Sequence, residues 1–262
     1  MAVADSGAAA ARAGGRGAGR DLRGTVLGVQ PPRADGASND ADESLARITA
    51  RGICRQKKRP RPSEIERPDI QRKRATYRRW RRTVDPGRLI FVDEAGANLA
   101  MGRSHAWVQK GTEYVEPRPM NWGNNLTLIG AIGQHGWVTL GTQWSVATAD
   151  SFAAWVRDRL APQLREGDIV VLDNLRAHKD PRVRWIIQAR GARVHFLPPY
   201  SYDYNPIESA WALLKKRIRA FAPRTAVALR QVARAARHVV KPHHCQQWFA
   251  HCGYANSSTI RG

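Results

Sequence analysis

Three acidic residues stand where strands and a helix would bring carboxylates together. Asp93 and Asp173 each close a short apolar run, RLIFVD and DIVVLD, and Glu208 opens a long amphipathic segment. Such runs are typical of buried strands, and the ligands of α/β sheets gather just beyond the carboxyl ends of their strands. We therefore expect the three carboxylates to share one edge of a sheet.

A cluster of this kind predicts metal-ion chemistry. Carboxylates that converge without a basic partner repel one another and raise each other's pKa unless divalent cations lie between them. A donor set made only of oxygen favours Mg²⁺ or Mn²⁺ over zinc. Two ions about 4 Å apart activate an attacking hydroxyl and stabilise the leaving oxygen of a phosphodiester. Asp93, Asp173 and Glu208 are therefore predicted to be catalytic metal ligands for phosphoryl transfer.

Each acid also has a purely structural interpretation. Asp93 could simply end a strand, and the pair Asp173-Asn174 could start a turn. Glu208 could be the last member of a helix cap that begins at Asn205. The residues alone leave these alternatives open.

The surrounding elements predict an α/β fold with a mixed sheet flanked by helices. Short apolar runs bounded by turn residues predict strands at Arg88–Asp93, Leu126–Ile132, Gly136–Thr142, Asp168–Asp173 and Ala192–Leu197. Helical apolar spacing predicts helices that begin at Asp150 or Ser151, at Pro181 and near Ile207. The first three strands can form hairpins, whereas the later alternation of strands and helices requires helices on the faces of the sheet.

Three segments around the acids resemble a known family. FVDEAG contains Asp93, VVLDNLRAHK contains Asp173, and FLPPYSYDYNPIESAWALLKK contains Glu208. Together they resemble the DDE-type transposases of bacterial insertion sequences related to mariner elements, and the likeness runs roughly from Lys58 to Tyr254. It implies a ribonuclease H-like catalytic domain that cleaves DNA at transposon ends and transfers the strand to target DNA. It also implies two Mg²⁺ or Mn²⁺ ions, double-stranded DNA as partner, and a homodimer on that DNA.

The resemblance extends to residues near the acids. It implies that three of them orient metal ligands or DNA, with the bracing of turns as the alternative: Asn174, His178 and Asn205. Trp107, in SHAWVQKGT, matches a family segment and is expected to pack. Tyr202 and Tyr204 depart from the family pattern, in which proline and leucine are commoner.

The charge of the chain predicts a polyanionic partner. The chain has 43 Lys and Arg against 22 acidic residues, a formal charge of +21, which attracts nucleic acid. We predict DNA contacts from the basic run before the first strand and from the helix face that Glu208 shares. These candidates are Arg78, Arg79, Arg81, Arg82, Lys215 and Arg219. A solubilising linker is the alternative for the basic run.

Composition divides the chain into four parts. Residues 1–50 are predicted to be disordered, because they are rich in Ala, Gly, Arg and Asp and lack an apolar pattern. Residues 51–86 are predicted to be a basic linker or arm, 87–240 the catalytic domain and 241–262 a C-terminal tail. No helix-turn-helix pattern occurs in residues 1–50, and we hypothesise that a separate or frame-shifted reading frame encodes the recognition module.

The tail invites a comparison with zinc sites. It contains His243, His244, Cys245, His251 and Cys252. Their spacing fits no standard zinc finger, so a packed helix around Trp248 and Phe249 is the preferred interpretation.

Three cysteines and the lack of a long apolar run predict a protein of a reducing compartment, without a membrane segment. We expect it in the bacterial cytoplasm, associated with the nucleoid. Two rival functions stay open. One is a nuclease of the same fold that does not transfer strands, and the other is a truncated, non-catalytic transposase remnant that only binds DNA.

Overall fold

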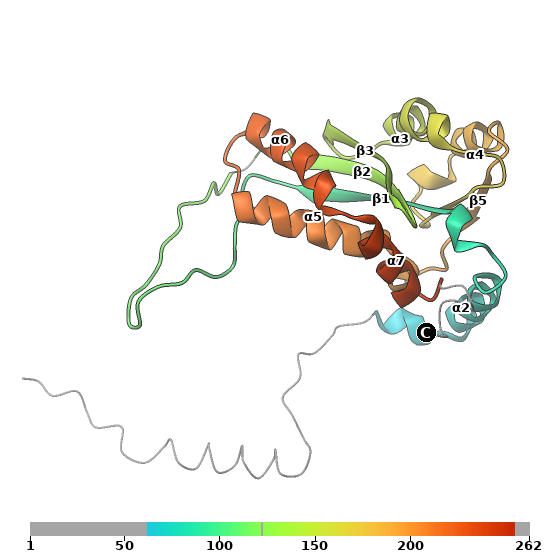
Figure 1. Ribbon diagram of the computed structural model, residues 1–262, viewed down its shortest axis with the longest axis horizontal. Coiled ribbons are helices and arrows are strands. Elements are labelled where there is room, and N and C mark those ends of the chain that lie inside the picture. The colour runs from blue at the N-terminus through green and yellow to red at the C-terminus, as the bar shows by residue number, and fades with distance from the viewer. Residues whose placement is uncertain (1–61, 122, 255–262) are drawn as a thin grey trace, which may run out of the picture. The chain divides into compact units, whose positions relative to one another are not determined.

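The computed structural model describes residues 62–121 and 123–254 (Figure 1). Its strands are β1 (Leu89–Ala97), β2 (Leu126–Gly133), β3 (Gly136–Trp144), β4 (Ile169–Leu172) and β5 (Arg193–Phe196). Its α-helices are α2 (Pro68–Trp80), α3 (Ala149–Trp155), α4 (Pro181–Gln188), α5 (Ile207–Phe221), α6 (Ala226–Ala236) and α7 (Pro242–His251). No helix in these two ranges is long and apolar enough to cross a membrane. The segment 1–50, predicted to be disordered, lies outside the described residues.

One mixed sheet forms the centre of the fold. Its strand order is β3-β2-β1-β4-β5. β1 pairs antiparallel with β2, and β2 with β3, whereas β4 runs parallel to both β1 and β5. The predicted hairpins and the predicted mixed sheet are confirmed, and the arrangement is ribonuclease H-like.

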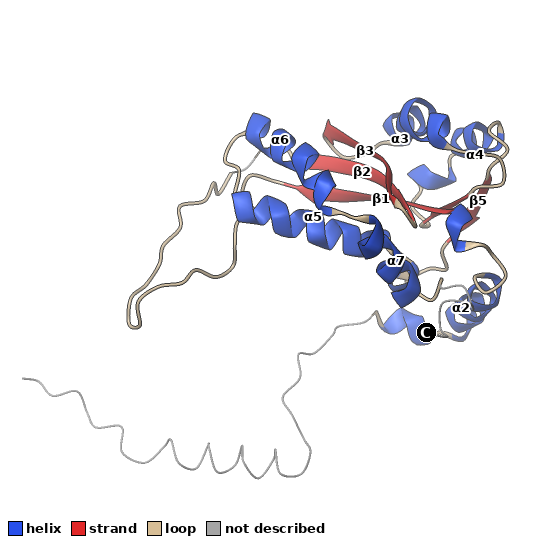
Figure 2. Cartoon of the chain, in the orientation of Figure 1, coloured by secondary structure: helices blue, strands red, loops and turns tan. Residues whose placement is uncertain are grey.

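Helices cover both faces of the sheet. In Figure 2, α5, α6 and α7 lie on one side of the strands and α3 and α4 on the other. Leu89 and Phe91 belong to the core under α5, whereas Ile90 and Val92 belong to the core under α3 and α4. Successive strand residues point to opposite faces, so a strand covered on both sides reads as an unbroken apolar run.

β1 is longer than predicted, and Asp93 does not end it. Parallel pairing with β4 stops at Phe91 opposite Val171. Antiparallel pairing with β2 continues through Asp93 opposite Gly130 as far as Ala97. β1 continues because β2 still supplies hydrogen bonds where pairing with β4 has ended.

The start of α3 also differs from the prediction. The N-cap is Thr148, rather than Asp150 or Ser151. Thr148 Oγ1 accepts a hydrogen bond from the Ser151 amide at 3.1 Å, and Ser151 Oγ accepts one from the Thr148 amide at 2.9 Å. This reciprocal capping box satisfies two backbone donors at the helix start.

Helix α2 occupies part of the segment predicted to be a linker. Ile70, Arg74 and Tyr77 are buried at the spacing of one helical face. Arg74 is only 4% exposed. Its guanidinium donates to Ser201 Oγ at 2.7 Å and to both carboxylate oxygens of Asp203 at 2.9 and 2.6 Å. Residues 68–80 are thus packed against the body of the domain and are not a solvated linker.

Tyr204 is the centre of a cluster that ties α2 to the turn before α5. The guanidinium carbons of Arg74 and Arg81 lie 4.2 and 4.7 Å from the centroid of its ring, and the Tyr77 ring stacks on it at 5.7 Å. Tyr254 donates its hydroxyl to the Tyr204 carbonyl at 2.7 Å. The tyrosine that departs from the family pattern therefore offers a π face to two cations.

The C-terminal tail contains the packed helix that the sequence predicts. Cys245 and Phe249 of α7 are buried, and the Phe249 ring meets the Phe91 ring edge-on at 5.3 Å. Cys245 and Cys252 are free thiols within the main core. Their contribution in the described structure is apolar packing.

Replacing Arg74 with Ala is expected to lower the free energy of unfolding by about 2 kcal/mol, because Asp203 and Ser201 lose their shared donor. The loss is smaller than the roughly 3–5 kcal/mol of a fully buried pair, since the Asp203 side chain is 46% exposed. Urea denaturation measures the change. Arg67→Ala is the matched control, because Arg67 and Asp69 form an exposed pair at the start of the same helix. It should cost no more than about 0.5 kcal/mol, and equal losses in the two variants would contradict the assignment.

Candidate active site

The sheet register places Asp93 and Asp173 side by side. Phe91 pairs with Val171 across the parallel strands β1 and β4. Asp93 and Asp173 each follow two residues later, so both extend from the same face as that pair. Glu208 is the second residue of α5, whose buried residues pack against this face. The structure therefore brings the three predicted carboxylates to one place.

The three carboxylates influence one another's protonation. Asp93 is 9% exposed, and burial raises its pKa to about 7, with further increases from Glu208 and Asp173. The pKa of Glu208 is also raised, first by burial and then by Asp173, against the opposing effect of Lys215. Both Asp93 and Glu208 are thus held where a negative charge is unfavourable without a compensating cation.

His178 connects Asp173 to a fourth acid that the sequence reasoning missed. Its Nδ1 lies 2.5 Å from Asp173 Oδ1, and its Nε2 lies 3.0 Å from Glu94 Oε1. The imidazole is buried, and its centroid lies 4.3 Å from that of the Phe152 ring. Burial lowers the pKa of His178, but the bonds to the two carboxylates outweigh this effect and raise it to about 9. The ring is therefore an imidazolium at neutral pH and donates both of its protons.

Glu94 could have been found from strand alternation. It follows Asp93 directly, so its side chain extends from the opposite face of β1, toward the core that contains Phe152. A carboxylate aimed at an apolar layer requires a partner, and His178 provides one. Glu94 Oε2 is buried and has no hydrogen bond in the described structure.

The two asparagines differ in their contacts. Asn174 Nδ2 donates to the carbonyl of Leu197 at 2.5 Å, which ties the turn after β4 to the end of β5. Asn205 is 5% exposed, and its Oδ1 is buried without a hydrogen-bond partner in the described residues. Glu208 makes no capping bond at the start of α5. The Glu208 carboxylate therefore does not act as a helix cap.

The predicted DNA contacts fall into two groups. Arg78 donates to the Tyr204 hydroxyl at 3.1 Å, and Arg81 donates to the carbonyl of Cys252 at 2.7 Å. These two guanidinium groups make contacts that hold α2 in place. The other four candidates have no side-chain hydrogen bond in the described residues and are at least partly exposed: Arg79, Arg82, Lys215 and Arg219.

The packing expected of Trp107 is wrong. Its relative exposure is 104%, so the ring makes no buried contact. Trp107 lies in the long connection between β1 and β2, which extends away from the sheet in Figure 1. The connection is anchored near its start, where Arg224 donates to the carbonyls of Leu99 and Met101, and Trp107 lies beyond these contacts.

The donor chemistry of the site fits Mg²⁺ or Mn²⁺. Asp93, Asp173 and Glu208 offer only oxygen atoms. Burial acts to raise the pKa of Asp173, but hydrogen bonds from His178 and the Leu175 amide outweigh burial, and this pKa is lowered. The uncompensated charge therefore lies at Asp93 and Glu208, whose pKa values are raised. Within the described residues, no three His, Cys, Asp or Glu side chains are gathered closely enough to hold an ion as they stand. Asp173 Oδ1 is engaged by His178 and by the Leu175 amide at 2.9 Å. Its second oxygen is the one left for a ligand.

Replacing His178 with Gln is expected to remove a pH-dependent part of the stability of the metal-free protein. The folded pKa of about 9 exceeds the ordinary value of 6.5, so this part is fully present below pH 6.5 and is lost as the pH rises through 9. The difference is worth roughly 3 kcal/mol at most. Urea denaturation in EDTA at several pH values measures it. Parent and His178→Gln curves that decline in parallel between pH 7 and 9.5 would show that His178 is not the titrating group.

The architecture is similar to that of solved transposase structures. The Mos1 transposase paired-end complex with the left transposon end matches with a TM-score of 0.61 at 16% identity, covering 80% of this chain and 66% of that chain. The Mos1 strand transfer complex matches with a TM-score of 0.62 at 16% identity, covering 80% and 65%. This chain therefore spans just under two thirds of the Mos1 chains. At this identity the likeness shows the fold alone.

Sequence comparison identifies the family. No curated protein matches the chain in sequence. The family described as DDE superfamily endonuclease matches residues 88–229, which include Asp93, Asp173 and Glu208 and amount to more than half of the chain. The protein therefore belongs to the DDE superfamily endonuclease family.

Proposed function

We propose that this chain is the catalytic core of a DNA transposase that cleaves and transfers DNA strands at the ends of a bacterial insertion sequence. The observation that carries the proposal is the buried Asp93, whose pKa is raised by burial, by Glu208 and by Asp173 within the family-matched region. Stability alone does not favour like charges gathered at a strand edge, whereas a site that binds divalent cations requires them.

The proposed metal ligands are Asp93, Asp173 and Glu208, for two Mg²⁺ or Mn²⁺ ions. When bound, such ions activate the attacking oxygen and stabilise the leaving oxygen of a phosphodiester. His178 and Glu94 hold Asp173 in one orientation, because the imidazolium is fixed at both ends. The cluster around Tyr204 holds the turn from which Glu208 enters the site.

The proposed substrate is double-stranded DNA. In cleavage, a water oxygen bonds to phosphorus as the bond to the 3′ oxygen breaks, and that oxygen leaves as a hydroxyl. In transfer, this 3′-hydroxyl bonds to a phosphorus of target DNA and displaces the 3′ oxygen of the target strand, which leaves as a hydroxyl. The Mos1 structures are named as paired-end and strand transfer complexes, and one paired-end complex contains Mg. These names support transposon ends as partners and strand transfer as the reaction. The proposal also includes target DNA, a homodimer that pairs two ends, and action at the nucleoid in the cytoplasm.

Asp93→Asn, Asp173→Asn and Glu208→Gln are each expected to lower the rate of Mg²⁺- or Mn²⁺-dependent DNA cleavage and joining by at least about a hundredfold, since loss of residues that only support metal ligands already costs 10–100-fold. The substrate is duplex DNA with the terminal repeats of the element, and gel electrophoresis resolves cleaved and joined products. Asp158→Asn is the control, because Asp158 is an exposed acid paired only with Arg157. Cleavage without joining would favour the nuclease, and DNA binding without cleavage would favour the non-catalytic remnant.

Mg²⁺ or Mn²⁺ is expected to stabilise the parent at pH 7.5 by about 1.4 kcal/mol when the ion concentration is ten times its Kd. The pKa of Asp93 is raised from 3.8 to about 7, so folding favours its protonated form and the ion-free protein loses stability as the pH rises through this range. Asp93→Asn should flatten that pH dependence and abolish most of the stabilisation by the ion. Thermal unfolding with and without the ion measures both effects. Equal stabilisation of parent and Asp93→Asn would exclude Asp93 as a ligand.

A further inference from the structure

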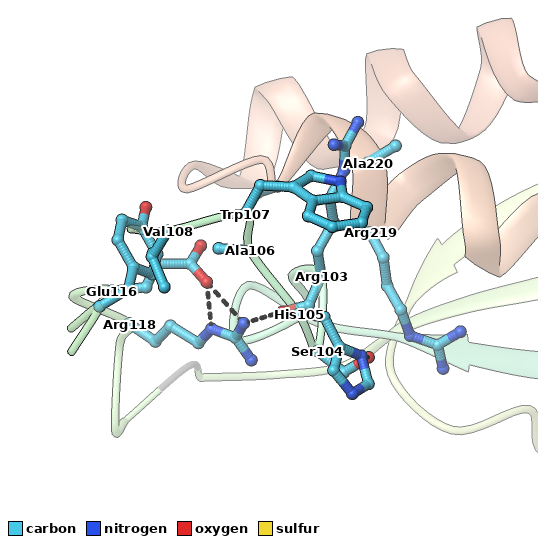
Figure 3. Close-up of a pocket in the computed structure, with 12 residues that line it drawn as sticks. Arg103, Ser104, His105, Ala106, Trp107, Val108, Glu116, Arg118, Arg219 and Ala220 are labelled. Carbon is cyan, nitrogen blue, oxygen red and sulfur yellow. Dashed lines mark hydrogen bonds and ion pairs between the residues drawn. The ribbon is translucent and has the colours of Figure 1, made fainter. Parts of the chain in front are cut away.

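A basic hollow of about 850 Å³ lies beside α5, apart from the three carboxylates. Three segments distant in sequence line it: the β1–β2 connection, α5 and the start of α7. Its five permanently charged side chains are Arg103, Lys216, Arg217, Arg219 and Lys241, and two imidazoles join them from His105 and His244. No Asp or Glu is among the lining residues. Figure 3 shows the adjoining pocket, where Arg103, Ser104 and His105 of the connection lie near Arg219 and Ala220 of α5.

The charges of the hollow are uncompensated. Within the described ranges, none of its five Lys and Arg side chains forms an ion pair with a carboxylate. The neighbouring Arg118 and Arg224 are different, because both pair with Glu116, at 2.5 and 2.6 Å. Like charges three or four residues apart on a helix repel each other. Lys216 and Arg219 are such a pair, so the hollow is stabilised when an anion enters it.

The size and the number of charges favour an extended polyanion. A single phosphate would fill a small part of 850 Å³ and could not contact side chains from all three segments. Duplex DNA carries one negative charge per roughly 1.7 Å of its axis, so a short stretch offers several phosphates to the five cations. We propose that this hollow binds the phosphodiester backbone of duplex DNA. The inference rests on the proposed function and adds a contact surface to it.

The hollow is set apart from the cleavage site along α5. Lys216 is eight residues beyond Glu208, which corresponds to about 12 Å of helix axis. Leu213, Lys216, Arg217 and Ala220 line the hollow at the spacing of one helical face. Arg219 lies close to the face of Glu208, but about three turns farther along the helix axis. At about 3.4 Å per base pair, the separation of about 12 Å corresponds to the length of roughly three to four base pairs of duplex DNA.

The test compares two triple variants of the full chain with equal charge loss. The first is Lys216→Gln, Arg217→Gln and Lys241→Gln in the hollow. The control is Arg184→Gln, Arg190→Gln and Arg193→Gln, exposed residues of α4, of the turn after it and of the start of β5. Fluorescence anisotropy in EDTA gives the Kd for a 30-base-pair duplex over a series of salt concentrations. Circular dichroism confirms the fold of each variant.

The hollow variant is expected to bind at least about tenfold more weakly at 0.15 M salt, with the slope of log K against log salt reduced by about 2.7 for three lost phosphate contacts. The control should change Kd by less than about twofold. Equal losses in both variants, or an unchanged slope in the hollow variant, would overturn the proposal. If the triple variant does not fold, Lys216→Gln and Lys241→Gln singly should each reduce the slope by about 0.9.

Two further outcomes separate this inference from the proposed activity. A parent that binds DNA through the hollow but does not cleave it would refute the transposase activity and leave the hollow assigned. A parent that cleaves DNA, with the salt slope unaltered in the hollow variant, would refute only the hollow. Inorganic phosphate that competes with DNA at equal concentration of phosphate groups would show a site for small anions and overturn the assignment to DNA.

Discussion

Repulsion between carboxylates that the sheet register holds together is the constraint on which the structure depends. Asp93 and Asp173 cannot move apart, because the parallel pairing of β1 with β4 fixes the positions from which both extend. Glu208 cannot withdraw either, since α5 is anchored by its buried apolar face. Burial first, and then repulsion by Glu208, Glu94 and Asp173, raise the pKa of Asp93 to about 7. A divalent cation would relieve the repulsion between the carboxylates without any change of fold.

Two sets of contacts keep this arrangement from relaxing. On one face of β1, the imidazolium of His178 bridges Asp173 and Glu94, so the carboxylate of Asp173 is held by a group that itself cannot rotate. On the other face, the Tyr204 ring lies under two guanidinium groups, and Asp203 bonds the buried Arg74. Helix α2 thus fixes the approach of the chain to Glu208. Both sets of contacts include charged side chains that are partly or wholly buried. Hydrogen bonds to such groups are strong, so displacing either partner is unfavourable.

The sequence predicted the parts of the fold that depend on local patterns. Apolar runs ending near Asp93 and Asp173 identified the central strands, because a strand buried on both faces reads as an unbroken apolar run. The spacing of apolar residues from Ile207 identified α5, because a helix buried on one face repeats them every three or four residues. It missed contacts that join distant residues: Arg74 meets Asp203, which is 129 positions away. In the sequence, Arg74 is one basic residue among many, and only its spacing from Ile70 and Tyr77 hinted at burial. Glu94 was missed although strand alternation aims it at an apolar layer, because its partner His178 is 84 positions away in the sequence. The roles of the triad, Asn174 and Asn205 in catalysis stay predictions.

The distribution of charge separates the binding of DNA from the binding of metal ions. The three carboxylates also repel the phosphates of DNA. The residues proposed to hold the metal ions therefore do not attract DNA to the site. The formal charge of +21 must then act from elsewhere on the surface, and the hollow beside α5 concentrates five of those charges away from the acids. The site therefore has two separate requirements. Cations must neutralise the carboxylates, and basic side chains must hold the phosphodiester backbone of the flanking DNA. A variant that loses one should keep the other, because the charged side chains of α5 in the hollow begin about 12 Å beyond Glu208 along the helix axis.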